Sequence, residues 1–370
     1  MKAIFNIFIY SLIIIICYMM INFSPTRLAC SNNYVKKNRN LTVCRILIIS
    51  LLFTLYNVFV TNGQLPTGGD RLNYYIDFLG YRENESIALS FIFDFVKRIN
   101  GSIFTVYYIT TFICCCLNFL AYSKFSLANK KVALLFLLTD AVLYSFTALK
   151  QCYAFAFSAL LFANLLDNKE SNDIINIIYI VLACLFHTSG YILIPLFITI
   201  KIVKKHPSAL YISVFAVFFV FVFFQPILLY FASLLKNVLP VLSKKIMNYF
   251  GDSMPEGGRS IQIIKWIPFY FITFLGFYYR KSLRSKIVNY DLFLIISIIS
   301  SGLALFSFFN YWFYRFLPLF YLPNFTFFVL INEKVSDKSN RLLNYIIVYG
   351  GVALVFYRWL FLIFINYGGF

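Results

Sequence analysis

The sequence predicts an all-α integral membrane protein, a polytopic bundle of about twelve transmembrane helices forming a single membrane domain over residues 1–370. Its residues are 61% hydrophobic and only 12% charged, whereas soluble proteins are about 45–50% apolar and about 25% charged. The apolar residues also occur in runs of roughly 20, a length that crosses a hydrocarbon layer about 30 Å thick. This composition excludes a soluble domain.

The predicted spans are apolar runs between charged or turn-rich breaks. They cover residues 3–23, 43–61, 102–122, 132–147, 150–166, 173–187, 189–203, 208–230, 262–279, 289–308, 312–331 and 342–364. Segment 86–99 is too short and too charged to cross comfortably, so we expect an interfacial or re-entrant helix there.

Basic residues predict the orientation of these spans. Of the 32 lysines and arginines, 19 fall in one set of alternate loops, residues 24–45, 123–131, 167–172, 201–207, 280–288 and 332–341. The positive-inside rule places this set in the cytoplasm. Residues 62–101, with the interfacial helix, and residues 231–261 then become external loops. Topology therefore accounts for the net charge of +18, and no nucleic-acid partner is expected.

Polar residues gather at the predicted outer face. Asp70 and Arg71 follow a glycine pair in what we expect to be a flexible stretch. They either meet an external polar substrate or form a solvated ion pair worth at most ~1 kcal/mol. Lys150 and Gln151 lie between two apolar spans, so the ammonium faces an internal polar cavity or extends to the lipid headgroups.

Other polar residues are also open to two interpretations. His187 ends a span and is either a site residue or part of a turn in which Thr188 and Ser189 serve as N-cap residues. Arg259 lies in an external loop containing glycine and proline, where it lines a site or is solvated.

Two charged residues fall inside predicted spans. Arg315 lies in an aromatic span, where burial costs ~2.5–3.5 kcal/mol, so it needs an anionic partner. Asp140 falls in the middle of a span, where it pairs with a basic residue, stays protonated or belongs to a proton path.

Three segments together resemble the EpsG-like members of the Wzy-type bacterial polysaccharide polymerases, which include O-antigen polymerases. The first is similar to that family's external glycine-aspartate-x-x-x-tyrosine segment, and reads Gly69-Asp70-Arg71-Leu72-Asn73-Tyr74. The second is similar to an arginine-glutamine motif opening a helix, and reads Leu149-Lys150-Gln151-Cys152-Tyr153-Ala154-Phe155-Ala156, followed later by Phe186-His187-Thr188-Ser189-Gly190. The third is the late aromatic helix with Arg315.

The resemblance covers about residues 40–320 in order and spacing. Lys150 departs from the family pattern, in which arginine is usual. Lysine keeps the positive charge but gives up the bidentate geometry with which a guanidinium binds phosphate.

The resemblance implies a glycosyltransferase that joins oligosaccharide repeat units carried on undecaprenyl diphosphate. The reaction would take place at the outer face of the bacterial inner (cytoplasmic) membrane, in a periplasm-facing cavity formed by the external loops. The implied partners are the lipid-linked oligosaccharides and membrane lipid, with a chain-length regulator and a flippase as further candidates. The outer segments lack a dense carboxylate cluster, so we expect a mechanism without a metal or other cofactor.

In such a reaction Arg71, Lys150, Arg259 and Arg315 would attract the diphosphates. Asp70 or His187 would be the general base. Tyr74 and Gln151 complete the expected substrate-binding set.

Two other classes of protein remain open at this point. A multi-pass transporter or flippase for lipid-linked oligosaccharide would place charges along a path through both leaflets. A membrane acyltransferase acting on surface sugars would use His187 as its catalytic base.

Overall fold

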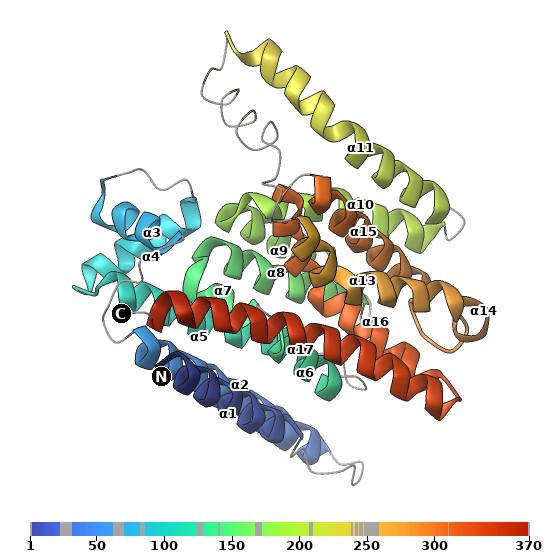
Figure 1. The fold of residues 1–370 in the computed structure, drawn as a ribbon, viewed down its shortest axis with the longest axis horizontal. Helices are drawn as coiled ribbons and strands as arrows, with labels where there is room; N and C mark the ends of the chain where they lie inside the picture. Colours follow the sequence, from blue (N-terminus) through green and yellow to red (C-terminus); the bar gives the residue numbers. More distant parts are fainter. Residues whose placement is uncertain are drawn as a thin grey trace. The chain divides into compact units, whose positions relative to one another are not determined.

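A computed structural model gives the arrangement of the helices. It describes residues 2–22, 32–61, 70–81, 86–123, 129–139, 141–166, 172–206, 210–237, 240, 243, 247, 259–309 and 311–368. Helices account for most of these residues and no strand occurs among them (Figure 1). The prediction of an all-α polytopic membrane protein is confirmed in outline.

The chain divides into two compact units. Unit 1 comprises Met1–Tyr191 and Val352–Phe370, and unit 2 comprises Ile192–Gly351. The boundaries fall within a short 3-10 helix, η1 (Thr188–Ile192), and within the last helix, α17 (Lys338–Gly368).

The elements of the two units follow one another along the chain. Unit 1 contains α1 (Lys2–Asn22), α2 (Asn32–Thr61), α3 (Asp70–Leu79), α4 (Ile87–Arg98), α5 (Ile103–Ser123), α6 (Asn129–Leu137), α7 (Ala141–Thr147), α8 (Leu149–Leu166) and α9 (Asp173–Phe186). Unit 2 contains α10 (Leu193–Lys205), α11 (Leu210–Leu235), α13 (Arg259–Tyr278), α14 (Arg280–Leu283), α15 (Tyr290–Phe309), the 3-10 helix η4 (Tyr311–Phe320) and α16 (Tyr321–Lys334).

Seven segments of the described chain are long and apolar enough to cross a membrane. They are Ile4–Ile21, Val43–Val60, Ile103–Ser123, Leu149–Leu166, Tyr290–Ser307, Phe313–Lys334 and Lys338–Arg358. Large apolar side chains also line the outside of α1, including Ile4, Phe8 and Leu12. Such a surface suits lipid and would be an aggregation hazard in water. The count of about twelve spans remains a prediction.

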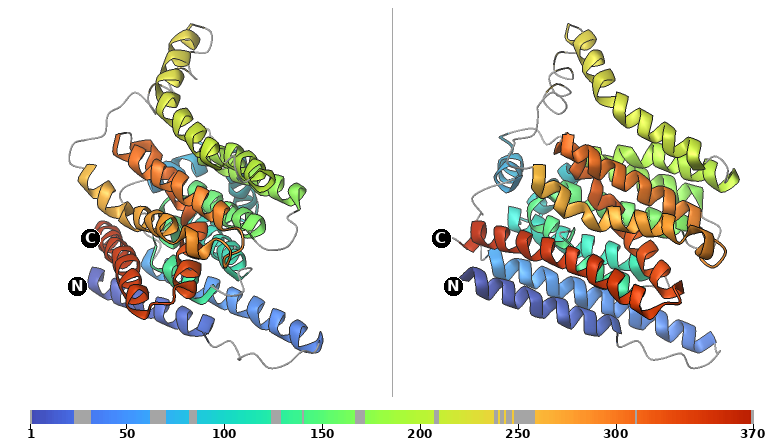
Figure 2. Two further views of the ribbon diagram at one scale, coloured as in Figure 1. Left: turned by 90° about the vertical axis from the view of Figure 1, so that its right-hand side faces the viewer. Right: turned by 45° about the vertical axis from the view of Figure 1, so that its right-hand side comes forward.

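Helix α8 is the buried centre of unit 1. It packs against α5, α7 and α9, and small residues let these neighbours approach closely, among them Ala156, Ala159 and Ala163. Helices α1 and α2 lie side by side (Figures 1 and 2), and α2 also packs along α5. Unit 1 therefore holds the start of α8 in a tightly packed setting.

Polar pairs fix the register of these helices. The Asn57 amide on α2 donates to the Thr111 hydroxyl on α5 at 2.8 Å. The Asn164 amide on α8 donates to Asn176 on α9, also at 2.8 Å. In an apolar surround such interhelical hydrogen bonds contribute roughly 0.6–2 kcal/mol each.

The predicted span 132–147 is interrupted. Helix α6 ends at Leu137 and α7 begins at Ala141. The Thr139 hydroxyl donates to the Phe136 carbonyl at 2.6 Å and accepts from the Ala141 N–H at 3.3 Å. These local bonds satisfy polar groups at the break between the two helices. Asp140 lies outside the described residues, so its role stays open.

Segment 62–101, for which we predicted an external loop with one helix, contains two helices. Helix α4 confirms the helix expected at 86–99, with Ser86 as its N-cap accepting the Leu89 N–H. Its exposed side carries Phe91, Phe95 and Ile99, a spacing suited to a lipid interface. Helix α3 replaces the flexible stretch that we expected at Asp70, and residues 62–69 lie outside the described chain.

In unit 2, α13, α15 and α16 pack together through polar and aromatic contacts. The Thr273 hydroxyl lies 2.6 Å from that of Ser297 and 2.7 Å from that of Ser301, joining α13 to α15. The Asn324 amide on α16 donates to Ser300 at 2.9 Å. Apart from the last residues of α11 and the first residues of α13, the predicted loop 231–261 lies almost wholly outside the described residues.

The predicted span 312–331 begins as a 3-10 helix. Element η4 runs for 10 residues and contains Pro318, and α16 continues the chain as an α-helix. Runs of 3-10 helix longer than about 3–4 residues are uncommon. Pro318 has no backbone N–H, so it weakens the α-helical pattern at this position.

Candidate functional site

One face of α3 carries three polar side chains that are buried in unit 1. Arg71, Tyr74 and Asp77 are 1%, 5% and 5% exposed, and a spacing of three residues places them on the same side of the helix. Asp70 is exposed in the first turn, where a carboxylate stabilises the positive end of the helix dipole. Helix formation therefore separates the predicted pair, turning Arg71 inward and leaving Asp70 at the surface.

Arg71 is buried between two helices. Its guanidinium carbon lies 4.6 Å from the centre of the Tyr107 ring on α5. Its Nε donates a hydrogen bond to the Phe146 carbonyl in the last turn of α7. An aromatic face and a carbonyl at the negative end of a helix both stabilise a cation that has been removed from solvent.

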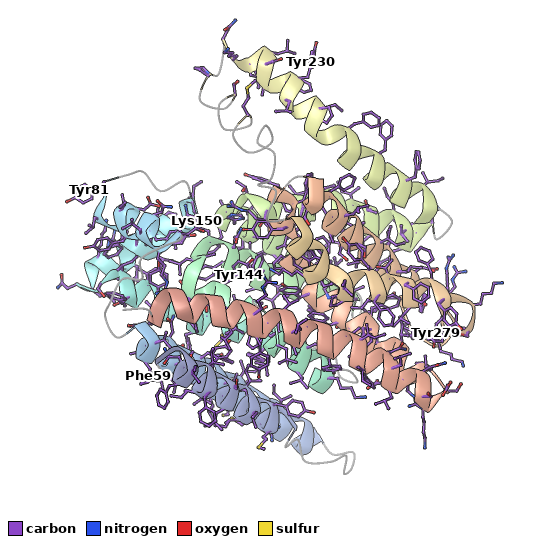
Figure 3. All side chains as sticks on the ribbon, viewed as in Figure 1. Phe59, Tyr81, Tyr144, Lys150, Tyr230 and Tyr279 are labelled. Carbon is purple, nitrogen blue, oxygen red and sulfur yellow. The ribbon has the colours of Figure 1, made fainter. Side chains whose placement is uncertain are left out.

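Lys150 stands beside the same face of α3. Its Nζ lies 5.5 Å from the centre of the Tyr74 ring, and the residue is half-buried in the first turn of α8 (Figure 3). The next residue, Gln151, is 6% exposed. A cation in a first turn is opposed by the helix dipole, at a cost of ~0.3–1 kcal/mol. Helix stability therefore does not explain a lysine at this position.

His187 lies at the end of α9, close to the start of α8. The rings of Tyr153 and Phe186 stack with their centres 4.1 Å apart, which joins the two helix ends. The Ser86 hydroxyl at the start of α4 donates to the Leu185 carbonyl at 3.1 Å. Three helices thus meet at the half-buried His187.

The hydrogen bonds of His187 fix which nitrogen carries its proton. The backbone N–H of Ser189 donates to Nδ1 at 3.1 Å, and the Ser189 hydroxyl lies 2.8 Å from the same atom. A backbone N–H can only donate, so Nδ1 is an acceptor and the neutral ring carries its proton on Nε2. His187 therefore presents a donor at Nε2, which suits binding better than proton abstraction.

The turn after His187 also corrects our N-cap prediction. Thr188 and Ser189 belong to η1, and α10 begins only at Leu193, after an Ile192 cap without a side-chain bond. Gly190 makes this turn possible, because a Cβ there would lie 2.6 Å from the Ala183 carbonyl carbon. The tight turn leaves Ser189 to orient the imidazole.

Most of the predicted site residues thus come together within unit 1. We call Arg71, Tyr74, Tyr107 and Lys150 the cation–aromatic cluster. Two cations held against two phenol rings offer charge for a phosphate and apolar surface for a sugar ring. Gln151 and His187 lie at the same end of unit 1, because the start of α8 packs against the end of α9.

Asp77 was missed by the sequence analysis. Its buried carboxylate shares the face of α3 that carries Arg71 and Tyr74. The helical spacing of these residues was the available signal, but it is visible only once 70–79 is recognised as a helix instead of a flexible stretch.

The two remaining predicted residues belong to unit 2. Arg315 is half-buried in η4, beside Phe313, whose ring contacts Phe306 and Phe316. Arg259 is the first residue of α13. Because α13 and α15 are antiparallel neighbours and η4 follows α15, both arginines lie toward the same end of unit 2.

Comparison with known proteins gives one family. The model of the EpsG family matches residues 46–368, which is most of the chain. Comparisons with curated proteins and with solved structures found no match.

Proposed function

The chain belongs to the EpsG family, whose members are Wzy-like polymerases, and we propose that it is a bacterial surface polysaccharide polymerase. Its substrates would be oligosaccharide repeat units, of an O-antigen or exopolysaccharide, carried on undecaprenyl diphosphate. The reaction would take place at the outer face of the inner membrane. The observation that carries this proposal, beyond the family match, is the cation–aromatic cluster at the predicted outer end of unit 1.

The proposed reaction is a glycosyl transfer between two lipid-linked molecules. A hydroxyl oxygen of the incoming repeat unit attacks the anomeric carbon of the growing chain. The new glycosidic C–O bond forms as the bond from the anomeric carbon to the diphosphate oxygen breaks. The leaving lipid diphosphate keeps the electron pair, and the hydroxyl proton passes to a general base.

In this proposal Arg71 and Lys150 stabilise the departing diphosphate. Preorganised cations are well suited to charge that develops in a transition state. The Tyr107 and Tyr74 rings hold the two cationic groups in place before substrate arrives. Because Lys150 is half-buried and Arg71 is almost fully buried, Lys150 is the more accessible of the two to the diphosphate.

We assign proton removal to Asp70 and hydrogen-bond donation to His187. The Asp70 carboxylate is exposed and accepts protons, whereas the neutral imidazole of His187 offers the Nε2 proton. Tyr74 and Gln151 would contact the sugars. Asp77 is a buried carboxylate on the same face of α3, and we propose that it positions Arg71 and Tyr74.

In unit 2, we propose that Arg315 and Arg259 bind a lipid-linked substrate through its phosphates. The half-buried setting of Arg315 in η4 supports this role, because a guanidinium among aromatic rings needs an anion or a polar surround. The mechanism would require no metal, since the cations of the chain supply the positive charge.

A strain lacking the gene tests the proposal directly. We expect its surface polysaccharide to consist of single, complete repeat units, and the wild-type gene to restore the ladder of chain lengths. A retained ladder would contradict a polymerase. Loss of all surface sugar would indicate a flippase, and full-length polysaccharide lacking acyl groups would indicate an acyltransferase.

A further inference from the structure

A second polar site lies in unit 2, apart from all of the residues discussed above. It is a pocket of about 330 Å³ between the end of α10 and the turn that joins α14 to α15. Its polar lining includes Lys204, Arg284, Asn289, Tyr290 and Asp291. Segments 201–207 and 280–288 belong to the basic set, so the predicted topology places this pocket at the cytoplasmic face.

The carboxylate of Asp291 binds two arginines, of which Arg284 lines the pocket. The Asp291 Oδ1 atom lies 3.3 Å from Nη2 of Arg280, and its Oδ2 atom lies 2.7 Å from Nη2 of Arg284. Asp291 is in the first turn of α15, where the helix dipole favours a negative charge. A guanidinium has five N–H donors, so Arg284 can bind Asp291 and a second anion together.

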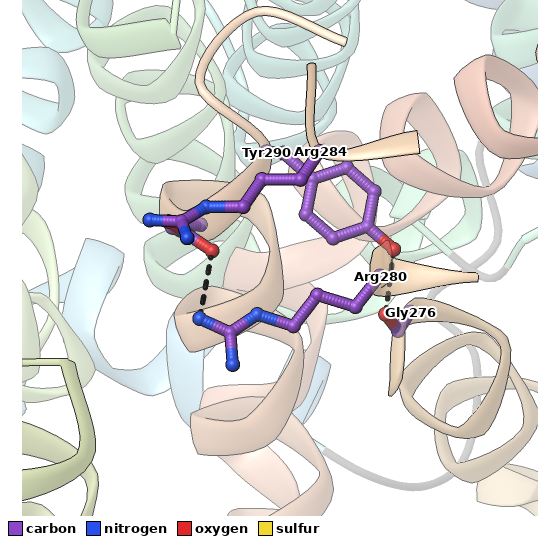
Figure 4. A network of polar contacts seen from close by, with 5 residues as sticks. Gly276, Arg280, Arg284 and Tyr290 are labelled. Carbon is purple, nitrogen blue, oxygen red and sulfur yellow. Dashed lines mark hydrogen bonds and ion pairs between the residues drawn. The ribbon is translucent and has the colours of Figure 1, made fainter. Parts of the chain in front are cut away.

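The backbone of the turn is fixed as well. Asn289 takes a left-handed conformation with φ of 60°, which asparagine tolerates better than most residues. The Tyr290 hydroxyl donates to the Gly276 carbonyl at 2.5 Å (Figure 4). Gly276 itself admits no side chain, because a Cβ there would lie 2.7 Å from the Phe327 ring. The turn thus holds its polar groups ready before any ligand arrives.

The pocket has an excess of positive charge. Lys204 and Arg284 line the pocket together with the carboxylate of Asp291, and Arg280, which does not line the pocket, also pairs with that carboxylate. Val203, Ile287 and Leu292 add buried apolar surface beside the charges. A pocket of this size lies within the range of small-molecule sites, about 300–1,000 Å³.

We propose that this pocket binds a phosphate-bearing anion, either the headgroup of an anionic phospholipid or a soluble phosphate compound. Basic pockets between transmembrane helices on the cytoplasmic side are suited to anionic headgroups. The Arg284 guanidinium and the Lys204 ammonium would contact the phosphate oxygens. The proposal does not depend on the polymerase reaction, because it uses none of that site's residues.

Ligand-induced stabilisation of the purified full-length protein can test the proposal. The protein, in an uncharged detergent at constant ionic strength, is titrated separately with dihexanoyl phosphatidylglycerol, dihexanoyl phosphatidylcholine and inorganic phosphate, and the melting temperature is followed. The pocket variant is Lys204→Gln/Arg284→Gln. The control is Lys281→Gln/Lys286→Gln, which removes the same charge from exposed residues of the same segment that do not line the pocket.

We expect wild type and control to bind the anionic ligand alike, and the pocket variant to bind it about tenfold more weakly or worse, as for lost charge-assisted hydrogen bonds. The single variant Arg284→Lys, which keeps the charge but not the guanidinium geometry, should bind more tightly than the pocket variant and so guards against a folding defect. Stabilisation by phosphatidylglycerol alone identifies a lipid headgroup, and stabilisation by phosphate identifies a soluble ligand. Equal binding by the pocket variant, equal loss in the control, equal stabilisation by phosphatidylcholine, or no stabilisation of wild type would each overturn the proposal.

Discussion

Replacing Lys150 by methionine separates the substrate-binding role of this residue from a structural one. Methionine keeps a similar length and removes the charge. Loss of the contact between the ammonium and the Tyr74 ring, 5.5 Å away, destabilises the folded protein by ~0.5–1 kcal/mol. Removing the positive charge, which the helix dipole opposes in the first turn of α8, stabilises the folded protein by ~0.3–1 kcal/mol. The two effects offset one another, so Lys150→Met should accumulate in the membrane at the wild-type level.

The effect on the reaction should be far larger. A hydrogen bond between a charged group and the diphosphate is worth ~1.5–3 kcal/mol, which corresponds to a rate loss of roughly ten- to hundredfold. In a complemented deletion strain, this loss should appear as a shift of the polysaccharide ladder toward single repeat units. Lys150→Arg keeps the charge and adds the bidentate geometry, so it should retain long chains.

Lys97 provides a matched control for this substitution. Its Nζ lies 5.3 Å from the centre of the Phe78 ring, a contact like that of Lys150, but it is exposed in the last turn of α4. Lys97→Met should leave chain length unchanged. A Lys150→Met protein that is well expressed and makes wild-type chains would refute the assignment of Lys150 to the diphosphate.

Three further predictions concern other parts of the chain. His187→Gln should keep more polymerisation than His187→Leu, because the glutamine amide can replace the Nε2 donor. If both variant proteins are abundant and equally inactive, His187 instead acts as the general base. Arg315→Lys should lose most polymerisation at normal protein abundance, because an ammonium cannot form two parallel hydrogen bonds to phosphate, and Arg315→Ala should lose more. An abundant Arg315→Ala protein that still makes long chains would exclude this residue from the site. In a cysteine-free background, a cysteine at Asp70 should react with an impermeant reagent in intact cells and one at Lys204 should not; the opposite pattern would invert the topology.

The sequence predicts the helices well where apolar runs are long and uninterrupted. Helices α5, α8 and α9 begin and end within a few residues of the predicted spans, and the Ser86 cap marks α4. Apolar runs do not predict where a helix is interrupted. The run at 132–147 is divided between α6 and α7 beside Thr139, although hydropathy alone gives no sign of an interruption there.

The site could be predicted in its residue types and only partly in its arrangement. Lys150 and His187 were expected near one membrane face, and the stacking of Tyr153 on Phe186 brings their helices together there. The inward turn of Arg71 and the burial of Asp77 were not foreseen, because glycine residues before Asp70 suggested a loop. Likewise, only the Ser189 N–H at Nδ1 reveals that His187 carries its proton on Nε2.

Elongation by the purified protein is the most direct test of the polymerase assignment. Wild-type protein in detergent is mixed with undecaprenyl-diphosphate-linked repeat units and a metal chelator, and the lipid-linked products are measured by mass spectrometry. We predict products with two or more repeat units on one lipid, formed much more slowly by Lys150→Met. Folded wild-type protein that leaves the single units unchanged, with or without added divalent metal, would contradict the polymerase assignment, and elongation only with restored magnesium or manganese would contradict its metal independence.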